Sequence, residues 1–407
     1  MKTGYKKLAA AMTAVACVMS MSGCADSGYL MTVDGMDIRN GIYLTQELTA
    51  YGSAQSKISE KQVSEGETSQ VEDIFSQQID GKSVSDWIKE ETLTSVKRYV
   101  AILRLAEQNG VTLTDEELNA VNADVKSMWN DENYYAQYIY GTDTIGEYYE
   151  SIGIGQDSMR DLSVSEELAD KLFTHYYDKD GVTPISDEEF NSYVTDNYAS
   201  VYILNIPYED YQGIPVTDEE GMKEIVNRAQ DYADRINSGT KITDIQYEQD
   251  LAEAKDAARL DAEDEYAERT EAGETLDFDK FVEEAVAAAS AEKSETIEEL
   301  LTVISKENSS ADVNVTDFIW NSAKPDGTAA VVAETADGSA CCVVVRYDIL
   351  NNSTWLENNR TTVLKTMKND DFEALLKETA EGYEVVSKDS LVNGKYAPEK
   401  IKGIEED

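Results

Sequence analysis

Few residues in this chain of 407 could carry out nucleophilic, acid–base or metal chemistry. The single histidine is His175, and the cysteines are Cys17, Cys24, Cys341 and Cys342. One histidine and four scattered cysteines supply neither a zinc ligand set nor a Ser-His-Asp or Cys-His pair of ordinary spacing. His175 stands in a helical Leu-Phe-Thr-His-Tyr-Tyr run, so we interpret it as a core or surface residue rather than a catalytic one. The sequence predicts no metal site and no cofactor.

The charge balance excludes further classes of function. The chain has 81 acidic and 35 basic residues and a formal net charge of -46, which rules out general binding to nucleic acid. With so many acids, no pair of carboxylates can be singled out as a glycosidase site. The run Asp178-Lys179-Asp180-Gly181 resembles the start of a calcium loop but lacks the later ligands, so it predicts a turn.

The two adjacent cysteines lie in a β-type run. Neighbouring residues of a strand point to opposite faces, so we interpret Cys341 and Cys342 as two small buried residues rather than a strained disulfide or a redox site.

The amino terminus has the pattern of an export signal. Three lysines precede an apolar run from Leu8 to Met21 that is too short for a permanent membrane helix. The run closes on Met21-Ser22-Gly23-Cys24, which resembles the lipobox of bacterial lipoproteins. We therefore predict a signal peptide over residues 1–23, a lipid on Cys24, and a location on the extracytoplasmic face of the cell membrane.

Residues 24–198 are predicted to be mostly helical. Residues 29–51 read as a strand, an Asp-Gly turn and a helix, residues 52–72 as a loop or a frayed helix, and residues 84–109 as a helix. Later helix starts are marked by the capping-box pairs Thr114 with Glu117, Ser186 with Glu189, and Thr217 with Glu220.

Residues 199–350 have the pattern of an α/β domain. A β-type run ends at Pro207, and a helix follows over 222–236. We interpret the acidic segment at about 246–292 as a solvated helical insertion, with a partner-binding helix as the alternative. A helix over 297–304, strands over 329–334 and 340–347, and a closing helix within 351–407 complete the chain, so the predicted fold class is α+β.

This order of elements resembles the SurA/PrsA group of extracytoplasmic foldases. The motifs that suggest it are Thr32-Val33-Asp34-Gly35, the Ile185–Phe190 capping box and the strand entry at Tyr198. The resemblance implies a helical SurA-N-like chaperone module and a parvulin-like domain that isomerises X-Pro bonds.

The parvulin-like region departs from the family pattern. Tyr202 and Cys342 stand near the places of the family's two histidines, and Asn308 stands at the place of its Cys or Asp. The apolar segment that would form the prolyl pocket is missing after Trp320. Because isomerisation must lower an ~18–20 kcal/mol barrier by gripping the proline ring and the twisted amide, these losses predict an inactive domain.

We therefore predict a lipid-anchored chaperone or foldase that binds unfolded exported proteins. Its predicted client-binding side chains are six tyrosines with large contact areas and few torsions, Tyr134, Tyr135, Tyr138, Tyr140, Tyr148 and Tyr149. Two alternatives stay open: an active isomerase with a rebuilt site near Tyr202, Asn308 and Cys342, and a lipidated solute-binding protein with two lobes of βαβ units. The oligomeric state is not specified by the sequence.

Overall fold

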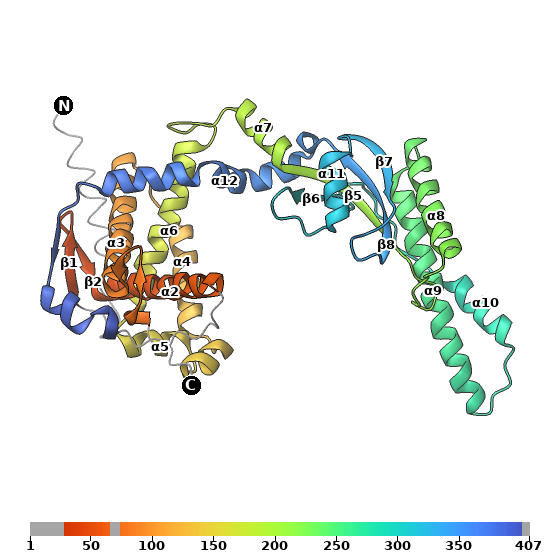
Figure 1. The fold of residues 1–407 in the computed structure, drawn as a ribbon, viewed down its shortest axis with the longest axis horizontal. Coiled ribbons are helices and arrows are strands. Elements are labelled where there is room, and N and C mark those ends of the chain that lie inside the picture. Colours follow the sequence, from red (N-terminus) through yellow and green to blue (C-terminus); the bar gives the residue numbers. More distant parts are fainter. Residues whose placement is uncertain (1–27, 66–73, 401–407) are drawn as a thin grey trace. The chain divides into compact units, whose positions relative to one another are not determined.

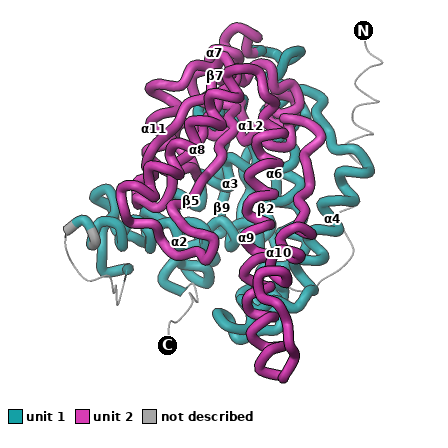
Figure 2. Tube along the Cα trace, turned by 90° about the vertical axis from the view of Figure 1, so that its right-hand side faces the viewer, with its two compact units in different colours: residues 1–184, 364–407 teal, residues 185–363 magenta. Residues whose placement is uncertain are grey.

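The computed structural model describes residues 28–65 and 74–400. The chain divides into two compact units, residues 1–184 with 364–407 and residues 185–363, which Figure 2 distinguishes by colour. We call them unit 1 and unit 2. The predicted signal peptide and Cys24 lie outside the described residues.

Unit 1 is mostly helical and carries a small sheet. Its elements in chain order are β1 (Tyr29–Val33), β2 (Met36–Arg39), α2 (Asn40–Glu65), η1 (Ile74–Ser76), β3 (Gln78–Ile79), β4 (Lys82–Ser83), α3 (Val84–Asn109), α4 (Asp115–Asn130), η2 (Ala136–Tyr140), α5 (Ile145–Ile152) and α6 (Gln156–Tyr177). The unit is completed by the part of α12 (Ser353–Ala380) from Leu364 onward, β9 (Val385–Ser387), η4 (Leu391–Lys395) and η5 (Pro398–Lys400).

The first and last strands of unit 1 lie in one sheet. Asp34 and Gly35 both have positive φ, 50° and 71°, as a tight hairpin turn requires, and join β1 to β2 as predicted. On its other side β1 pairs antiparallel with β9, so the strand order is β2-β1-β9. Strands from near the start and near the end of the described residues thus meet in one sheet of unit 1.

Three helices form the body of unit 1. In Figure 1, α3 and α6 run side by side and α2 crosses them. The predicted loop or frayed helix over 52–72 is wrong as far as Glu65, because α2 continues through that residue. Ala54 and Ile58 are buried against Trp87 and Ile88 of α3, so packing between helices stabilises a stretch whose own apolar pattern is weak.

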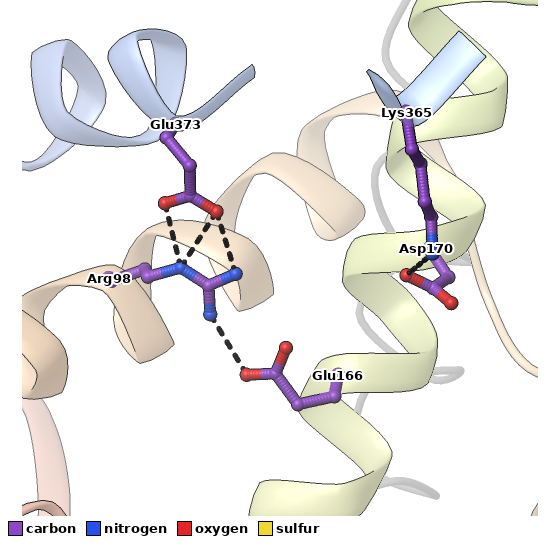
Figure 3. Close-up of polar contacts among 5 residues, drawn as sticks. All are labelled: Arg98, Glu166, Asp170, Lys365 and Glu373. Carbon is purple, nitrogen blue, oxygen red and sulfur yellow. Dashed lines mark hydrogen bonds and ion pairs between the residues drawn. The ribbon is translucent and has the colours of Figure 1, made fainter. Parts of the chain in front are cut away.

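An ion-pair network binds α12 to the other helices of unit 1 (Figure 3). The Arg98 guanidinium donates from Nε and Nη2 to the Glu373 carboxylate at 2.9 Å each, and from Nη1 to Glu166 at 2.9 Å. Lys365 of α12 donates to Asp170 of α6 at 2.7 Å. Since the fork of a guanidinium matches a carboxylate in a fixed geometry, Arg98 sets the position of α12 on α3.

Unit 2 is built on one four-stranded antiparallel sheet. Its elements are α7 (Asp187–Asn197), β5 (Tyr198–Pro207), α8 (Glu219–Asn237), α9 (Ile242–Glu271), α10 (Phe278–Ala288), β6 (Thr302–Ser305), α11 (Val313–Asn321), β7 (Asp326–Val332), β8 (Ala340–Tyr347), η3 (Ile349–Asn351) and the start of α12. The strand order is β6-β5-β8-β7, which places the first strand beside the last.

Each face of this sheet has its own apolar core. On one face Tyr202, Leu204 and Val343 pack against α8 and the start of α9. On the other face Val201, Cys342 and Val344 pack against α11. The alternation of side chains along a strand therefore decides which core each residue of β5 and β8 enters.

The predicted domain boundaries lie after residues 198 and 350. The two compact units instead divide after residues 184 and 363. The helix α7 belongs with unit 2, because Phe190 and Val194 are buried there and Arg360 stacks on Phe190, with Cζ 4.5 Å from the ring centre. The closing helix is shared between the units at residues 363 and 364, a division that no local sequence signal marks.

Two local predictions in unit 2 are also wrong. The predicted capping box of Thr217 and Glu220 does not form: the N-cap is Asp218, whose side chain accepts from Gly221 N–H at 2.8 Å, and glycine has no side chain to complete a box. The helix predicted over 297–304 is a turn followed by β6, since Val303 and Ile304 are β-branched and pair with β5. The predicted α+β class, a helical module with an α/β domain and a helical insertion, is confirmed. Within the described residues, no helix is both long and apolar enough to span a membrane.

Candidate functional site

Tyr202, one of the three parvulin-type positions, is buried in the sheet of unit 2. Its ring is 1 % exposed, and its hydroxyl donates to the Gln246 side-chain oxygen of α9 at 2.9 Å. Burial raises the pKa of this phenol well above its ordinary value. A neutral, buried and already bonded hydroxyl is poorly placed to act on a bound peptide.

The structure does not bring Tyr202, Asn308 and Cys342 together. Cys342 pairs opposite Asn205, so it lies on the face of the sheet opposite to Tyr202. The β8 residues on the Tyr202 face are Cys341, Val343 and Val345. Asn308 is exposed in the loop after β6. Tyr202 is opposite Val345 and Cys342 is opposite Asn205, so the strand register separates the two positions in both face and place along the sheet.

The adjacent cysteines are both buried as free thiols. Burial, followed by the neighbouring thiol of Cys341, raises the pKa of Cys342 to about 11. Because the thiolate is the reactive form, this environment disfavours nucleophilic chemistry at Cys342.

The tyrosine-rich segment of unit 1 forms a closed turn, which we call the tyrosine turn (residues 131–144). Its ends are joined by a β-bridge between Glu132 and Thr144, and Asn133 N–H donates to the Asp143 carbonyl at 3.1 Å. The Asn133 side chain accepts from Tyr135 N–H at 2.9 Å, and Ala136 is fully buried beneath. These bonds fix the backbone, so the side chains of the turn start from a defined scaffold.

The six predicted client-binding tyrosines divide into two groups. Tyr134, Tyr135 and Tyr138 are 75 %, 69 % and 79 % exposed, and the rings of Tyr134 and Tyr138 stack at 6.2 Å. The others are half-buried in a chain of rings that leads to the buried Trp129 of α4: Tyr140 stacks on Tyr148 at 3.8 Å, Tyr148 contacts Tyr149, and Tyr149 stacks on Trp129 at 5.9 Å. The second group packs the turn against the module, and the first group is displayed to solvent.

Two apolar residues that sequence analysis missed extend the exposed group. Met128 and Ile139 are each 39 % exposed, and both lie beside the tyrosines in the chain. Their signal was present in the sequence, since Ile139 lies within the Tyr-rich run and Met128 precedes it. Single exposed apolar side chains are ordinary on protein surfaces, but five within twelve residues form a concentration.

The surroundings of the tyrosine turn are acidic. No lysine or arginine lies between Lys126 and Arg160. The same stretch contains six acidic residues: Asp131, Glu132, Asp143, Glu147, Glu150 and Asp157. Aromatic faces and carboxylates both attract cations, so this surface suits apolar segments that carry Lys or Arg. His175, in the last turn of α6, contacts Tyr176 edge to face at 5.6 Å and lies outside this cluster.

No protein-family model matches the chain, and no curated protein matches it. Among solved structures, the chain is similar to the crystal structure of foldase protein PrsA from Streptococcus pneumoniae str. Canada MDR_19A. The sequence identity is 12 %, the match covers 79 % of this chain and 98 % of that chain, and the TM-score is 0.30. A TM-score of 0.30 is below the level at which two folds count as the same, so neither the fold nor the function of this chain rests on the match.

Proposed function

We propose that this protein is a lipid-anchored, extracytoplasmic chaperone whose tyrosine turn binds unfolded segments of exported proteins. The observation that carries the proposal is the display of Tyr134, Tyr135 and Tyr138 on a hydrogen-bonded turn. Tyrosine rings bury much apolar area while few torsions become ordered, and their hydroxyls accept varied polar neighbours. Such a surface fits many sequences with modest affinity, as a chaperone requires.

The net charge of the chain supports a role in keeping clients soluble. Loss of residues 1–23 would remove three lysines and leave 32 basic against 81 acidic residues. Complexes with that charge repel one another. The protein is also repelled by the anionic membrane surface, so in this proposal the lipid on Cys24 alone anchors it. Clients with Lys or Arg next to apolar residues would be favoured, and salt would weaken their binding.

Unit 2 serves in this proposal as a binding or structural domain rather than as an isomerase. Its sheet buries Tyr202 in one core and Cys342 in the other, and Asn308 lies outside both. These three positions therefore do not form a polar frame on one face that could hold a twisted prolyl amide.

The test is suppression of the aggregation of a refolding client by residues 25–407, which include every described residue. The change of Tyr134, Tyr135 and Tyr138 together to serine should remove most of the suppression, because the exposed rings supply the contact area. Light scattering at several ratios of chaperone to client, in low and high salt, measures the effect.

The matched control changes three exposed apolar residues elsewhere, Tyr29, Val182 and Ile214, to serine. This control should suppress aggregation as the parent does. A parent chain that leaves aggregation unchanged at several-fold excess would contradict the chaperone function. Equal loss in both variants would contradict the assignment to the tyrosine turn.

A further inference from the structure

The helices α9 and α10 of unit 2 form a hairpin that extends away from the sheet (Figure 1). The helix α10 has no buried residue, and beyond Gln249 the one buried residue of α9 is Ala262. Helices in folded proteins are stabilised mainly by packing of an apolar face. Phe278 of α10 is 41 % exposed, so the outer hairpin presents apolar surface that its own fold does not cover.

A groove of about 460 Å³ lies between the two helices. Its floor is apolar and consists of Ala258 and Ala262 of α9 with Phe281 and Ala285 of α10. Three alanines beside one phenylalanine leave a hollow that is open to solvent along the hairpin. The groove can take at least one large apolar side chain from a partner.

The rim of the groove is acidic. Asp261, Glu265 and Glu284 line it, and Asp261 has no ion pair among the described residues. Glu265 binds Arg269 at 3.2 Å, and the Arg269 guanidinium also lies 5.3 Å from the Phe281 ring centre. The hairpin thus already holds one cation between a carboxylate and this ring, which shows the geometry that a partner's Lys or Arg could adopt.

The charge of the whole hairpin limits what can occupy the groove. Residues 242–292 contain seventeen acidic and four basic residues. A second copy of this chain, a nucleic acid and an anionic membrane would all be repelled by that surface. A segment that combines apolar residues with Lys or Arg is attracted to both the floor and the rim.

We propose that the groove between α9 and α10 is a docking site for a cationic amphipathic helix. One apolar side chain of this helix enters the hollow beside Phe281, and its basic residues lie against Asp261, Glu265 and Glu284. The inference goes beyond the proposed function, because it concerns unit 2 and does not depend on the tyrosine turn.

The experiment measures binding of a fluorescein-labelled helical peptide of leucine and lysine to residues 25–407 by fluorescence anisotropy. All chains carry the changes Tyr134→Ser, Tyr135→Ser and Tyr138→Ser, so a failure of the groove is distinguishable from a failure of the tyrosine turn. Two reference peptides have glutamate in place of lysine or serine in place of leucine. The proposal expects weak or no binding of either, since the first loses the charge attraction and the second loses the side chain that fills the hollow.

The groove variant Asp261→Asn/Glu265→Gln/Glu284→Gln is expected to weaken binding about tenfold or more. The matched control Asp256→Asn/Glu271→Gln/Glu283→Gln removes the same charge from the same hairpin but from no lining residue, and should weaken binding less than about threefold. Equal effects of the two variants, or unchanged binding of the groove variant, would overturn the proposal.

The single change Phe281→Ser tests the floor separately. It should also weaken binding about tenfold while the helix content measured by circular dichroism stays that of the parent, because α10 buries no residue. Equal binding of the leucine and serine peptides to the chain with an unchanged groove would show that charge alone acts, and would refute the docking groove.

Discussion

The carboxyl group of Glu47 is buried in unit 1, and its replacement should make the protein more stable at neutral pH. Glu47 lies on α2 with an exposed fraction of 0 %, and neither carboxyl oxygen has a hydrogen-bond partner of good geometry among the described residues. Burial is the main cause that raises the pKa of Glu47 to about 8. The Tyr43 hydroxyl and the positive charge of Lys89 lower the pKa of Glu47, and the negative charge of Glu399 raises it.

The size of the effect follows from the two pKa values. The ordinary pKa of 4.5 applies to the unfolded chain, and a pKa of about 8 applies to the folded one. Below pH 4.5 both states hold the proton, so the ionisation of Glu47 costs no stability. As the pH rises from 4.5 to 8 the unfolded state loses its proton first, and folding loses about 1.4 kcal/mol per pH unit. At pH 7 the accumulated cost is about 3 kcal/mol.

The change Glu47→Gln removes this cost because the amide has nearly the same shape and does not ionise. We expect the variant to be more stable than the parent by about 1–3 kcal/mol at pH 7, since the amide also needs partners that the site provides only in part. The advantage should shrink steadily and vanish near pH 4.5. Urea unfolding followed by tryptophan fluorescence measures it, because Trp87 and Trp129 are buried in the same unit.

The matched control is Glu60→Gln on the exposed side of the same helix. It removes the same charge without relieving a buried group, so its stability should differ from that of the parent by less than about 0.5 kcal/mol. A difference between Glu47→Gln and the parent that is independent of pH, or an equal gain in the control, would refute the argument from burial.

Three further predictions concern the anchor, the sheet and the closing helix. Cys24→Ala should release the protein to the soluble fraction or leave an unprocessed precursor, and fractionation like that of the parent would exclude the lipid. A protease-coupled assay on an X-Pro peptide should show no turnover above the uncatalysed rate. Turnover that is lost on changing Tyr202, Asn308 or Cys342 would instead establish the rebuilt isomerase. Arg98→Ala should destabilise unit 1 by about 1–3 kcal/mol, since it leaves Glu373 and Glu166 without their shared cation. An unchanged urea midpoint would contradict that role for Arg98.

Features that depend on neighbouring residues could be predicted from the sequence. The Asp34-Gly35 turn follows from the positive φ that these residues tolerate. The capping box at Thr114 is present in full, with Thr114 Oγ accepting from Glu117 N–H at 3.2 Å and the Glu117 carboxylate accepting from Thr114 N–H at 2.6 Å. The Tyr-rich run was visible as composition, although its division into exposed and packed rings was not.

Features that depend on strand register or on helix packing could not be predicted. Tyr202 and Cys342 lie on opposite faces in the register in which β5 and β8 pair, and a shift of one residue would bring them to the same face. Likewise, nothing in the sequence around Glu47, which lies between Leu44 and Leu48, indicates that it is buried. Its burial results from the packing of α2.

The sequence by itself determined the charge of this protein, its local turns and caps, and the α+β order of its elements, because each of these depends on composition or on residues a few positions apart. The tertiary structure alone decided that β9 pairs with β1, that α7 joins unit 2, and that the groove of the acidic hairpin has an apolar floor. These features arise from contacts between residues far apart in the chain, and many pairings of similar strands and helices satisfy the same local pattern. The cooperative packing of the whole unit selects one of them.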